Sequence, residues 1–80
     1  MKASVYDRIE TVQDVTGDFS GQLIPAGTSG TVVEAYEHPV EGYAVDLAIP
    51  APDLVGDYRY ENVILRPGQF RVVEKYEERG

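Results

Sequence analysis

The strongest constraint on how this chain folds is a stretch of strict two-residue alternation near its centre. Along residues 43–49, large apolar side chains (Tyr, Val, Leu and Ile) occupy the odd positions, and Ala or Asp occupies the even positions. Successive side chains of a β-strand point to opposite faces of a sheet. The period of two therefore predicts a strand with one strongly apolar face.

Four further segments are rich in the β-branched and aromatic residues that favour strands. The segment nearest the start alternates imperfectly, which predicts a β-bulge or a strong local twist. Together with the central stretch, these segments predict five short strands. The four segments cover residues 5–12, 31–36, 58–65 and 70–76.

Glycine and proline residues separate the five segments and set the lengths of the connections. The first connection is long, over 16–27, and the second is a short hairpin over 37–42. A Pro/Gly-rich loop follows over 50–57, and the link over 66–69 is short enough for a single 3₁₀ turn. Only the run over 74–79 has helical composition, and it either forms a short helix or frays.

This order of connections is typical of an SH3-like barrel. We therefore predict an all-β, five-stranded SH3-like barrel with a short 3₁₀ turn before the last strand. Closing the sheet into a barrel also removes unpaired strand edges. A chain of 80 residues has the size of one small domain, so we expect a single domain over residues 1–80.

The composition also limits where such a protein works. The chain has no cysteine, which excludes disulfides and thiolate metal sites and fits a reducing compartment. Charge enters early, at Lys2 and Asp7, and no stretch approaches the ~20 apolar residues of a membrane span. We therefore expect a soluble, cytoplasmic protein with no signal peptide and no membrane partner.

The net charge is the main compositional signal. Fourteen acidic residues face seven Lys and Arg residues, giving a formal net charge of −7. Acidity suits either solubility alone or a basic partner. It argues against nucleic-acid binding, which needs clustered positive charge. The arginines are instead scattered, at Arg8, Arg59, Arg66 and Arg71.

Three segments resemble a family of small bacterial proteins of unknown function. They are the opening Val-Tyr-Asp-Arg-Ile over 5–9, the central motif over 24–36 with its Gly-Thr-Val-Val-Glu strand, and the closing turn and strand over 65–73. The central motif is also similar to the Gly-Thr-Val strand of KOW-type and photosystem-accessory SH3-like barrels. The matched segments cover about half of the chain, and its loop over 50–57 departs from the family.

What the resemblance implies is an SH3-like barrel, with no family catalytic residue to carry over. Small proteins of this kind often stand beside toxin-like genes. The resemblance therefore also implies an immunity role as one expectation for the function.

The residues that commonly carry catalysis are few and poorly placed for it. His38 is the only histidine, and it precedes Pro39 in a predicted hairpin, where a solvated loop position is the simpler interpretation. Ser29 lies in a Gly-Thr-Ser-Gly turn, which differs from the Gly-x-Ser-x-Gly elbow of hydrolases. The stretch 14–18 resembles a calcium loop but continues with Phe19, where that loop needs glycine. We predict no catalytic residue, no metal site and no cofactor.

Two loops instead suggest a binding face for another protein. With this loop order, the long first loop and the loop before the fourth strand are expected to converge at one side. The predicted partner-binding residues are four carboxylates, two aromatic residues and one aliphatic residue, namely Asp14, Asp18, Phe19, Asp53, Leu54, Asp57 and Tyr58.

Several apolar residues in these loops have two interpretations. Phe19 fits either an exposed anchor or a core position, and Leu54 with Val55 either projects into solvent or folds back onto the barrel. We interpret Tyr60 as a residue of the core or of strand packing. The chain has no tryptophan, which disfavours a conventional proline-peptide groove.

The leading functional hypothesis is a non-enzymatic, acidic protein-binding module. Its most concrete form is an immunity or inhibitor protein that neutralises a basic partner such as a toxin, with charge guiding the encounter and aromatic residues holding the complex. One alternative is an accessory subunit that stabilises a larger enzyme or redox complex. The other alternative is a KOW-like nucleic-acid-binding module, which the net charge opposes.

Overall fold

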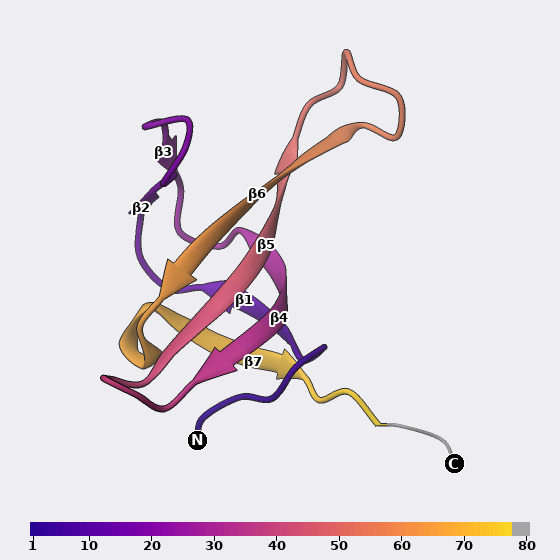
Figure 1. Cartoon of the computed structure of the whole chain (residues 1–80). Coiled ribbons are helices and arrows are strands. Elements are labelled where there is room, and N and C mark those ends of the chain that lie inside the picture. Colours follow the sequence, from indigo (N-terminus) through magenta and orange to yellow (C-terminus); the bar gives the residue numbers. More distant parts are fainter. Residues whose placement is uncertain (78–80) are drawn as a thin grey trace.

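The computed structural model describes residues 1–77, which form strands, turns and one short 3₁₀ helix (Figure 1). The all-β prediction and the predicted 3₁₀ turn before the last strand are both confirmed. The elements are β1 (Arg8–Thr11), β2 (Val15–Thr16), β3 (Leu23–Ile24), β4 (Ser29–Tyr36), β5 (Gly42–Pro50), β6 (Tyr58–Leu65), η1 (Pro67–Gln69) and β7 (Phe70–Glu74).

Five strands form one antiparallel sheet in the order β6-β5-β4-β1-β7, and β2 pairs with β3 in a separate hairpin. Pairing of β4 with β5 extends only as far as Gly30 opposite Leu47. Pairing of β5 with β6 continues to Pro50 opposite Tyr58. The ends of β5 and β6 therefore project past the start of β4 as a two-stranded ribbon.

The five predicted segments correspond to β1, β4, β5, β6 and β7. The bulge predicted near the chain start is confirmed, because the register between β1 and β7 shifts between Arg8 and Ile9. The long first connection, predicted as a loop, contains the β2–β3 hairpin, in which Val15 lies opposite Ile24 and both are buried. The sequence did not predict this hairpin, because strands of two residues are too short to show a period. Only the structure shows that these two side chains are buried.

The C-terminal run with helical composition begins inside β7, which ends at Glu74. Residues 75–77 adopt no regular secondary structure, and the remainder of that predicted segment, 78–79, lies outside the described residues.

The core lies on the inner face of the sheet, where the odd-numbered residues of β5 and β6 point. Tyr43 and Phe70 meet edge to face there, with ring centroids 5.2 Å apart. Gly30 of β4 has no room for a side chain, because a Cβ atom would lie 2.7 Å from Val45 Cγ1 and 2.9 Å from the Asp46 carbonyl oxygen. The largest fully buried side chains include Ile9, Ile24, Val32, Tyr43, Val45, Leu47, Val63, Leu65 and Phe70.

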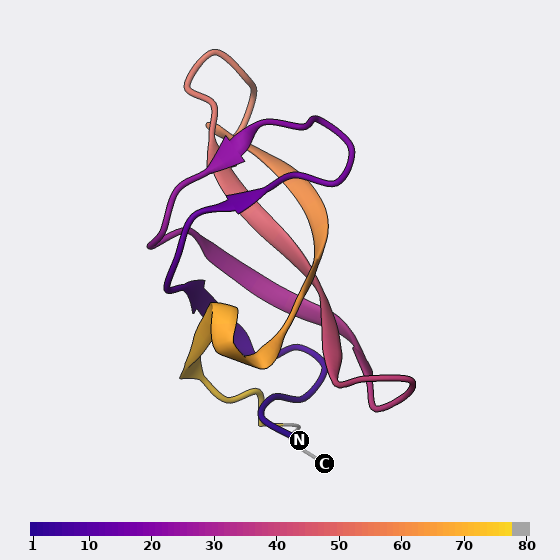
Figure 2. The ribbon, with the colours of Figure 1, turned by 90° about the vertical axis from the view of Figure 1, so that its left-hand side faces the viewer.

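Two views show how the connections are distributed around the sheet. The loop over 51–57 and the β2–β3 hairpin lie at one end of the molecule in both Figure 1 and Figure 2. The connection over 37–41 and the chain start lie at the other end. Among the described residues, no helix has the length and apolar character needed to cross a membrane.

Candidate functional site

The most prominent surface feature is the projecting ribbon of β5 and β6 with its loop, residues 48–60, here named the β5–β6 arm. Its loop is closed by backbone hydrogen bonds, in which Ala51 N donates to Asp57 O (2.8 Å) and Leu54 N donates to Ala51 O (2.9 Å). Asp57 N also donates to Leu54 O (3.0 Å), and Gly56 provides the positive φ of 89° that this turn requires. The arm therefore ends in a defined turn.

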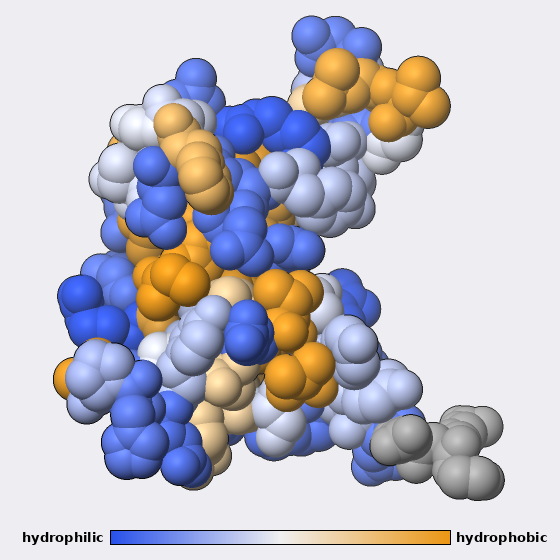
Figure 3. All heavy atoms as spheres, in the orientation of Figure 1, coloured by the Kyte–Doolittle hydropathy of each residue, from blue (hydrophilic) through white to orange (hydrophobic). Residues whose placement is uncertain are grey.

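The tip of the arm presents apolar side chains to solvent. Leu54 is 47% exposed and Val55 is fully exposed, at 104%. Figure 3 shows that hydrophobic surface gathers on the projecting loop at the upper right. Of the two interpretations that the sequence left open, the structure supports the one in which Leu54 and Val55 project into solvent. Asp53 and Asp57, on either side of them, are exposed as well.

The β2–β3 hairpin lies against β6 through a buried carboxylate. Glu61 accepts hydrogen bonds from Ser20 Oγ (2.8 Å) and from Ser20 N (3.3 Å), and Arg59 Nη1 lies 3.2 Å from its Oε1. The hydroxyl hydrogen bond from Ser20 is the main cause that lowers the pKa of Glu61, and it outweighs burial. Gly17 leaves space for this carboxylate, because a Cβ atom there would lie 1.9 Å from Glu61 Oε2.

The predicted binding residues of the first loop fall at separate places on this hairpin. Asp18 Oδ2 accepts a hydrogen bond from Ile64 N of β6 (3.2 Å). Asp14 Oδ1 accepts one from Ala26 N (2.8 Å), in the turn that precedes β4. Phe19 is 87% exposed at the hairpin tip, which selects the exposed alternative for this residue. The carboxylates of Asp14 and Asp18 thus already hold backbone amides of this chain, which leaves fewer of their lone pairs for a partner.

The predicted binding residues of the first loop and those of the β5–β6 arm lie at the same end of the molecule but do not form one contiguous cluster. Figures 1 and 2 place the hairpin and the arm loop at the same end with their tips apart. Among residues 1–77, no hydrogen bond or ion pair joins Asp14, Asp18 or Phe19 to residues 53–58. The arm therefore stands as a candidate site in its own right.

Tyr60 does not occupy the core or pack between strands, so its predicted role is wrong. It is 68% exposed, and Tyr58 is 48% exposed. The reason is strand parity: Val63 and Leu65 point inward, so Glu61 also points inward and the even-numbered residues of β6 face outward.

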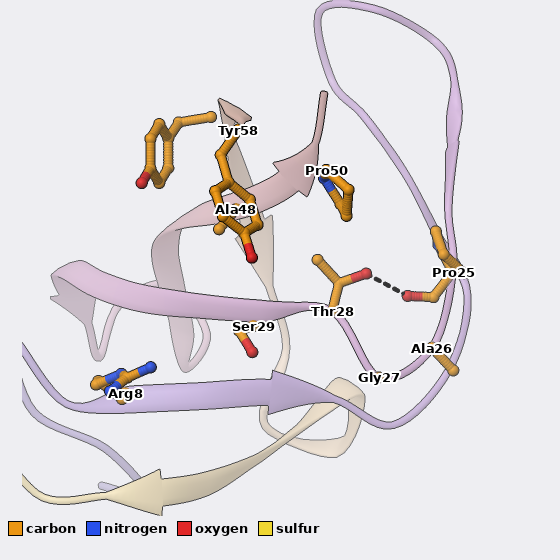
Figure 4. Close-up of a pocket in the computed structure, with 10 residues that line it drawn as sticks. Arg8, Pro25, Ala26, Gly27, Thr28, Ser29, Ala48, Pro50 and Tyr58 are labelled. Atoms are coloured by element: carbon orange, nitrogen blue, oxygen red, sulfur yellow. Dashed lines mark hydrogen bonds between the residues drawn. The ribbon is translucent and has the colours of Figure 1, made fainter. Parts of the chain in front are cut away.

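Both tyrosines line a surface groove of about 560 Å³ on the outer face of the sheet (Figure 4). The groove runs between the start of β4, the turn before it and the overhanging β5–β6 arm. Apart from Tyr58, sequence reasoning assigned none of its residues to a binding role, because they come from four separate segments and share no local pattern. The groove is lined by Arg8, Pro25, Ala26, Gly27, Thr28, Ser29, Ala48, Pro50, Tyr58 and Tyr60.

The two residues considered for catalysis in the sequence, His38 and Ser29, lie in separate parts of the fold. His38 is exposed in the connection over 37–41, and Ser29 opens β4 beside the groove. Among residues 1–77, no group of three His, Cys, Asp or Glu side chains is arranged to hold a metal ion.

Comparisons of this chain with protein-family models, with curated proteins and with solved structures each give no match. The resemblance to small bacterial SH3-like proteins therefore stays a prediction from the sequence.

Proposed function

We propose that this chain is a non-enzymatic, acidic protein-binding module built on an SH3-like barrel, with the tip of the β5–β6 arm as its binding element. In its most concrete form it is an inhibitor that neutralises a basic protein such as a toxin. The barrel assignment is supported by the strand order, by the long first connection with its hairpin, and by the 3₁₀ turn before β7.

The observation that carries this proposal is the full exposure of Val55 beside Leu54 on a loop fixed by its own hydrogen bonds. An isolated exposed apolar residue is ordinary on a protein surface. Two adjacent ones at the tip of an ordered projection form a preorganised anchor, which enters a partner's pocket at a low cost in conformational entropy.

The charges around the tip favour a basic partner. Asp53 and Asp57 lie on either side of the apolar pair, and the whole chain carries a net charge of −7. Acidic groups near an interface accelerate association with a basic surface, while buried apolar contacts slow dissociation. The tip therefore carries both acidic groups for association and apolar groups for a stable contact within five consecutive residues, 53–57.

Site-specific photo-crosslinking tests this proposal in the cells that make the protein. A benzophenone amino acid replaces Val55 in one variant and Val40 in the matched control, which is 69% exposed in the connection at the opposite end. We expect one dominant adduct from position 55, with a basic protein, and no such adduct from position 40. No adduct from position 55, or the same adducts from both positions, would refute the assignment of the arm.

Binding kinetics with the captured protein then test how the tip works. The double change Asp53→Asn and Asp57→Asn should slow association, with a larger effect at low salt because charge attraction is screened within ~8–10 Å at ordinary ionic strength. The change Leu54→Ala with Val55→Ala should accelerate dissociation instead. If both rates stay within about twofold in all variants, the tip does not hold the partner.

A further inference from the structure

The groove on the outer face arises where the sheet divides. Pairing of β4 with β5 stops at Gly30 opposite Leu47, and from there β5 continues only with β6. The chain before β4 turns away toward β1, with Gly27 N donating to Thr11 O (2.7 Å) and Thr11 N donating to Thr28 O (2.9 Å). The groove is the wedge between these two diverging ribbons.

The walls of the groove are fixed by contacts on both sides. Thr28 Oγ1 donates to the Pro25 carbonyl oxygen (2.6 Å), which holds the turn in shape, and Figure 4 marks this bond. On the other side, Ala48 lies opposite Tyr60, and Pro50 lies opposite Tyr58. The groove is therefore present in the folded chain before any ligand arrives.

The lining has an unusual charge for this protein. The chain has fourteen acidic residues, yet none of the ten lining residues is acidic, and one of them is Arg8. Figure 4 places Arg8 at one end of the groove and Pro25 with Ala26 at the other. The surface between them carries the tyrosine rings and the Ser29 hydroxyl.

Arg8 is only weakly engaged within the protein. Its Nη1 lies 3.8 Å from Glu74 Oε1, and both side chains are more than 60% exposed. An exposed ion pair at that separation contributes little to stability, because water screens the two charges. The guanidinium therefore has donors free for a carboxylate of a ligand, and Arg–carboxylate pairs are often bidentate.

The shape of the groove favours an extended chain over a compact small molecule. Small-molecule sites cover most of the ligand surface, about 70–90%. Here Tyr58 and Tyr60 are about half exposed or more, so the groove covers one side of its occupant only. An extended peptide can lie along such a groove with apolar residues against the aromatic rings.

We propose that this groove binds an extended peptide segment of another protein, with an acidic side chain of the peptide on Arg8 and apolar residues against Tyr58, Tyr60 and Pro50. This site is separate from the tip of the β5–β6 arm, and it goes beyond the function proposed above. It adds a second contact of opposite charge preference, because the tip selects basic surroundings and the groove selects a carboxylate.

A displayed library of random dodecapeptides, selected on the immobilised full-length protein, tests this inference. We expect the enriched peptides to share an acidic position next to apolar residues. A synthetic copy of one enriched peptide should shift the backbone amide signals of residues 27–29 and 48 in NMR spectra. The same peptide with glutamine in place of its acidic residue should bind on the order of tenfold more weakly, as expected for the loss of one charge-assisted hydrogen-bond pair.

Protein variants locate the contact. Arg8→Gln should weaken binding on the order of tenfold for the acidic peptide and leave the glutamine peptide unchanged. Arg71→Gln is the matched control, because Arg71 is also exposed and pairs with a carboxylate, Glu10, at 3.2 Å. Tyr60→Ala should weaken both peptides. The inference is overturned if no acidic consensus is enriched, if amide shifts fall elsewhere, or if Arg71→Gln weakens binding as much as Arg8→Gln.

Discussion

The two ends of the molecule differ in which side chains they bury: one end buries polar groups, and the other exposes apolar ones. At one end, a buried carboxylate and a buried tyrosine join the chain start, the β4–β5 connection and the segment after β7. We name this region the terminal clasp, and it consists of residues 2–7, 41–43 and 75–76. At the other end, the β5–β6 arm exposes apolar side chains. The contrast separates what holds the fold from what is available to a partner.

In the terminal clasp, Asp7 is 1% exposed and its carboxylate accepts three hydrogen bonds. They come from Ser4 N (2.9 Å), Tyr76 N (2.9 Å) and Lys75 Nζ (3.0 Å). One carboxylate therefore ties the first residues of the chain to the segment after β7. No buried side-chain nitrogen or oxygen among residues 1–77 lacks a hydrogen-bond partner, so this end meets the usual requirement for burying polar groups.

Tyr43 provides a second tie in the same region. Its ring lies in the core, while its hydroxyl donates to Glu41 and accepts from Lys2 N (2.8 Å). The hydroxyl hydrogen bond lowers the pKa of Glu41, and burial, together with that bond, raises the pKa of Tyr43. The Lys2 ammonium in turn lies 4.7 Å from the centre of the Phe70 ring. The chain start is thus held as part of the fold.

The largest effect should follow removal of the clasp carboxylate. Asp7→Ala removes the acceptor of two partly buried backbone amides and leaves Lys75 without its ion-pair partner. We expect the free energy of unfolding to fall by about 2–4 kcal/mol, measured by urea denaturation. Asp53→Ala, at an exposed carboxylate of the arm, is the control and should change it by no more than about 0.5 kcal/mol. Equal losses in the two variants would erase the contrast between the ends.

A second effect concerns the pH dependence of stability. Burial raises the pKa of Asp7, but hydrogen bonds from Tyr76 N, Ser4 N and Lys75 lower it by more, so the folded-state pKa lies below the ordinary value of about 3.9. A lowered pKa means that the ionised group adds stability in full above its unfolded-state pKa. That stability is lost as the pH falls through the folded-state pKa.

Denaturation of the wild type and of Asp7→Asn from about pH 6 down to about pH 2 measures this effect. The difference in unfolding free energy between them should be constant at the upper end and should shrink toward acid. Each pKa unit of lowering contributes about 1.4 kcal/mol. Glu41 and Glu61 titrate in both proteins, so the difference isolates Asp7. A difference that stays flat, or that grows toward acid, contradicts the hydrogen-bonded carboxylate.

Sequence patterns predicted the parts of this fold in which several residues repeat one signal. The alternation over 43–49 predicted β5, and the shortness of the link over 66–69 predicted the 3₁₀ turn. The patterns did not predict the β2–β3 hairpin, whose strands hold two residues each. The inward direction of Glu61 was also missed, because the hydrogen bonds that allow this carboxylate to be buried come mainly from Ser20, 41 positions away in the sequence.

Only the part of the candidate site with a local signal in the sequence was predicted. Leu54 and Val55 stand out locally, as an apolar pair in a Pro/Gly-rich loop, and their neighbours Asp53 and Asp57 were readily identified with them. Asp14 and Asp18 resembled them in type but bind backbone amides of Ala26 and Ile64. These hydrogen bonds join segments that are far apart in the sequence, so the sequence alone does not reveal them.

The smallest effect on stability should come from the tip of the arm. Val55 remains fully exposed and Leu54 about half exposed after folding, so the tip buries far less apolar surface than a core position, and hydrophobic stabilisation scales with that buried area. The double change Leu54→Ser and Val55→Ser should therefore alter the unfolding free energy by no more than about 0.5 kcal/mol in urea. Val45→Ser, at a residue with 0% exposure on the same strand pair, is the matched control and should cost several times more.

The same double variant links the comparison to function. The tip contributes little to the stability of the fold and still carries two adjacent, exposed apolar side chains. Removing their exposed surface from water in a complex would therefore stabilise that complex. The variant should therefore keep the wild-type unfolding curve while losing the partner that crosslinks at position 55. If the double change costs more than about 1 kcal/mol, the tip packs against the protein itself in solution, and the arm belongs with the terminal clasp among the elements that hold the fold.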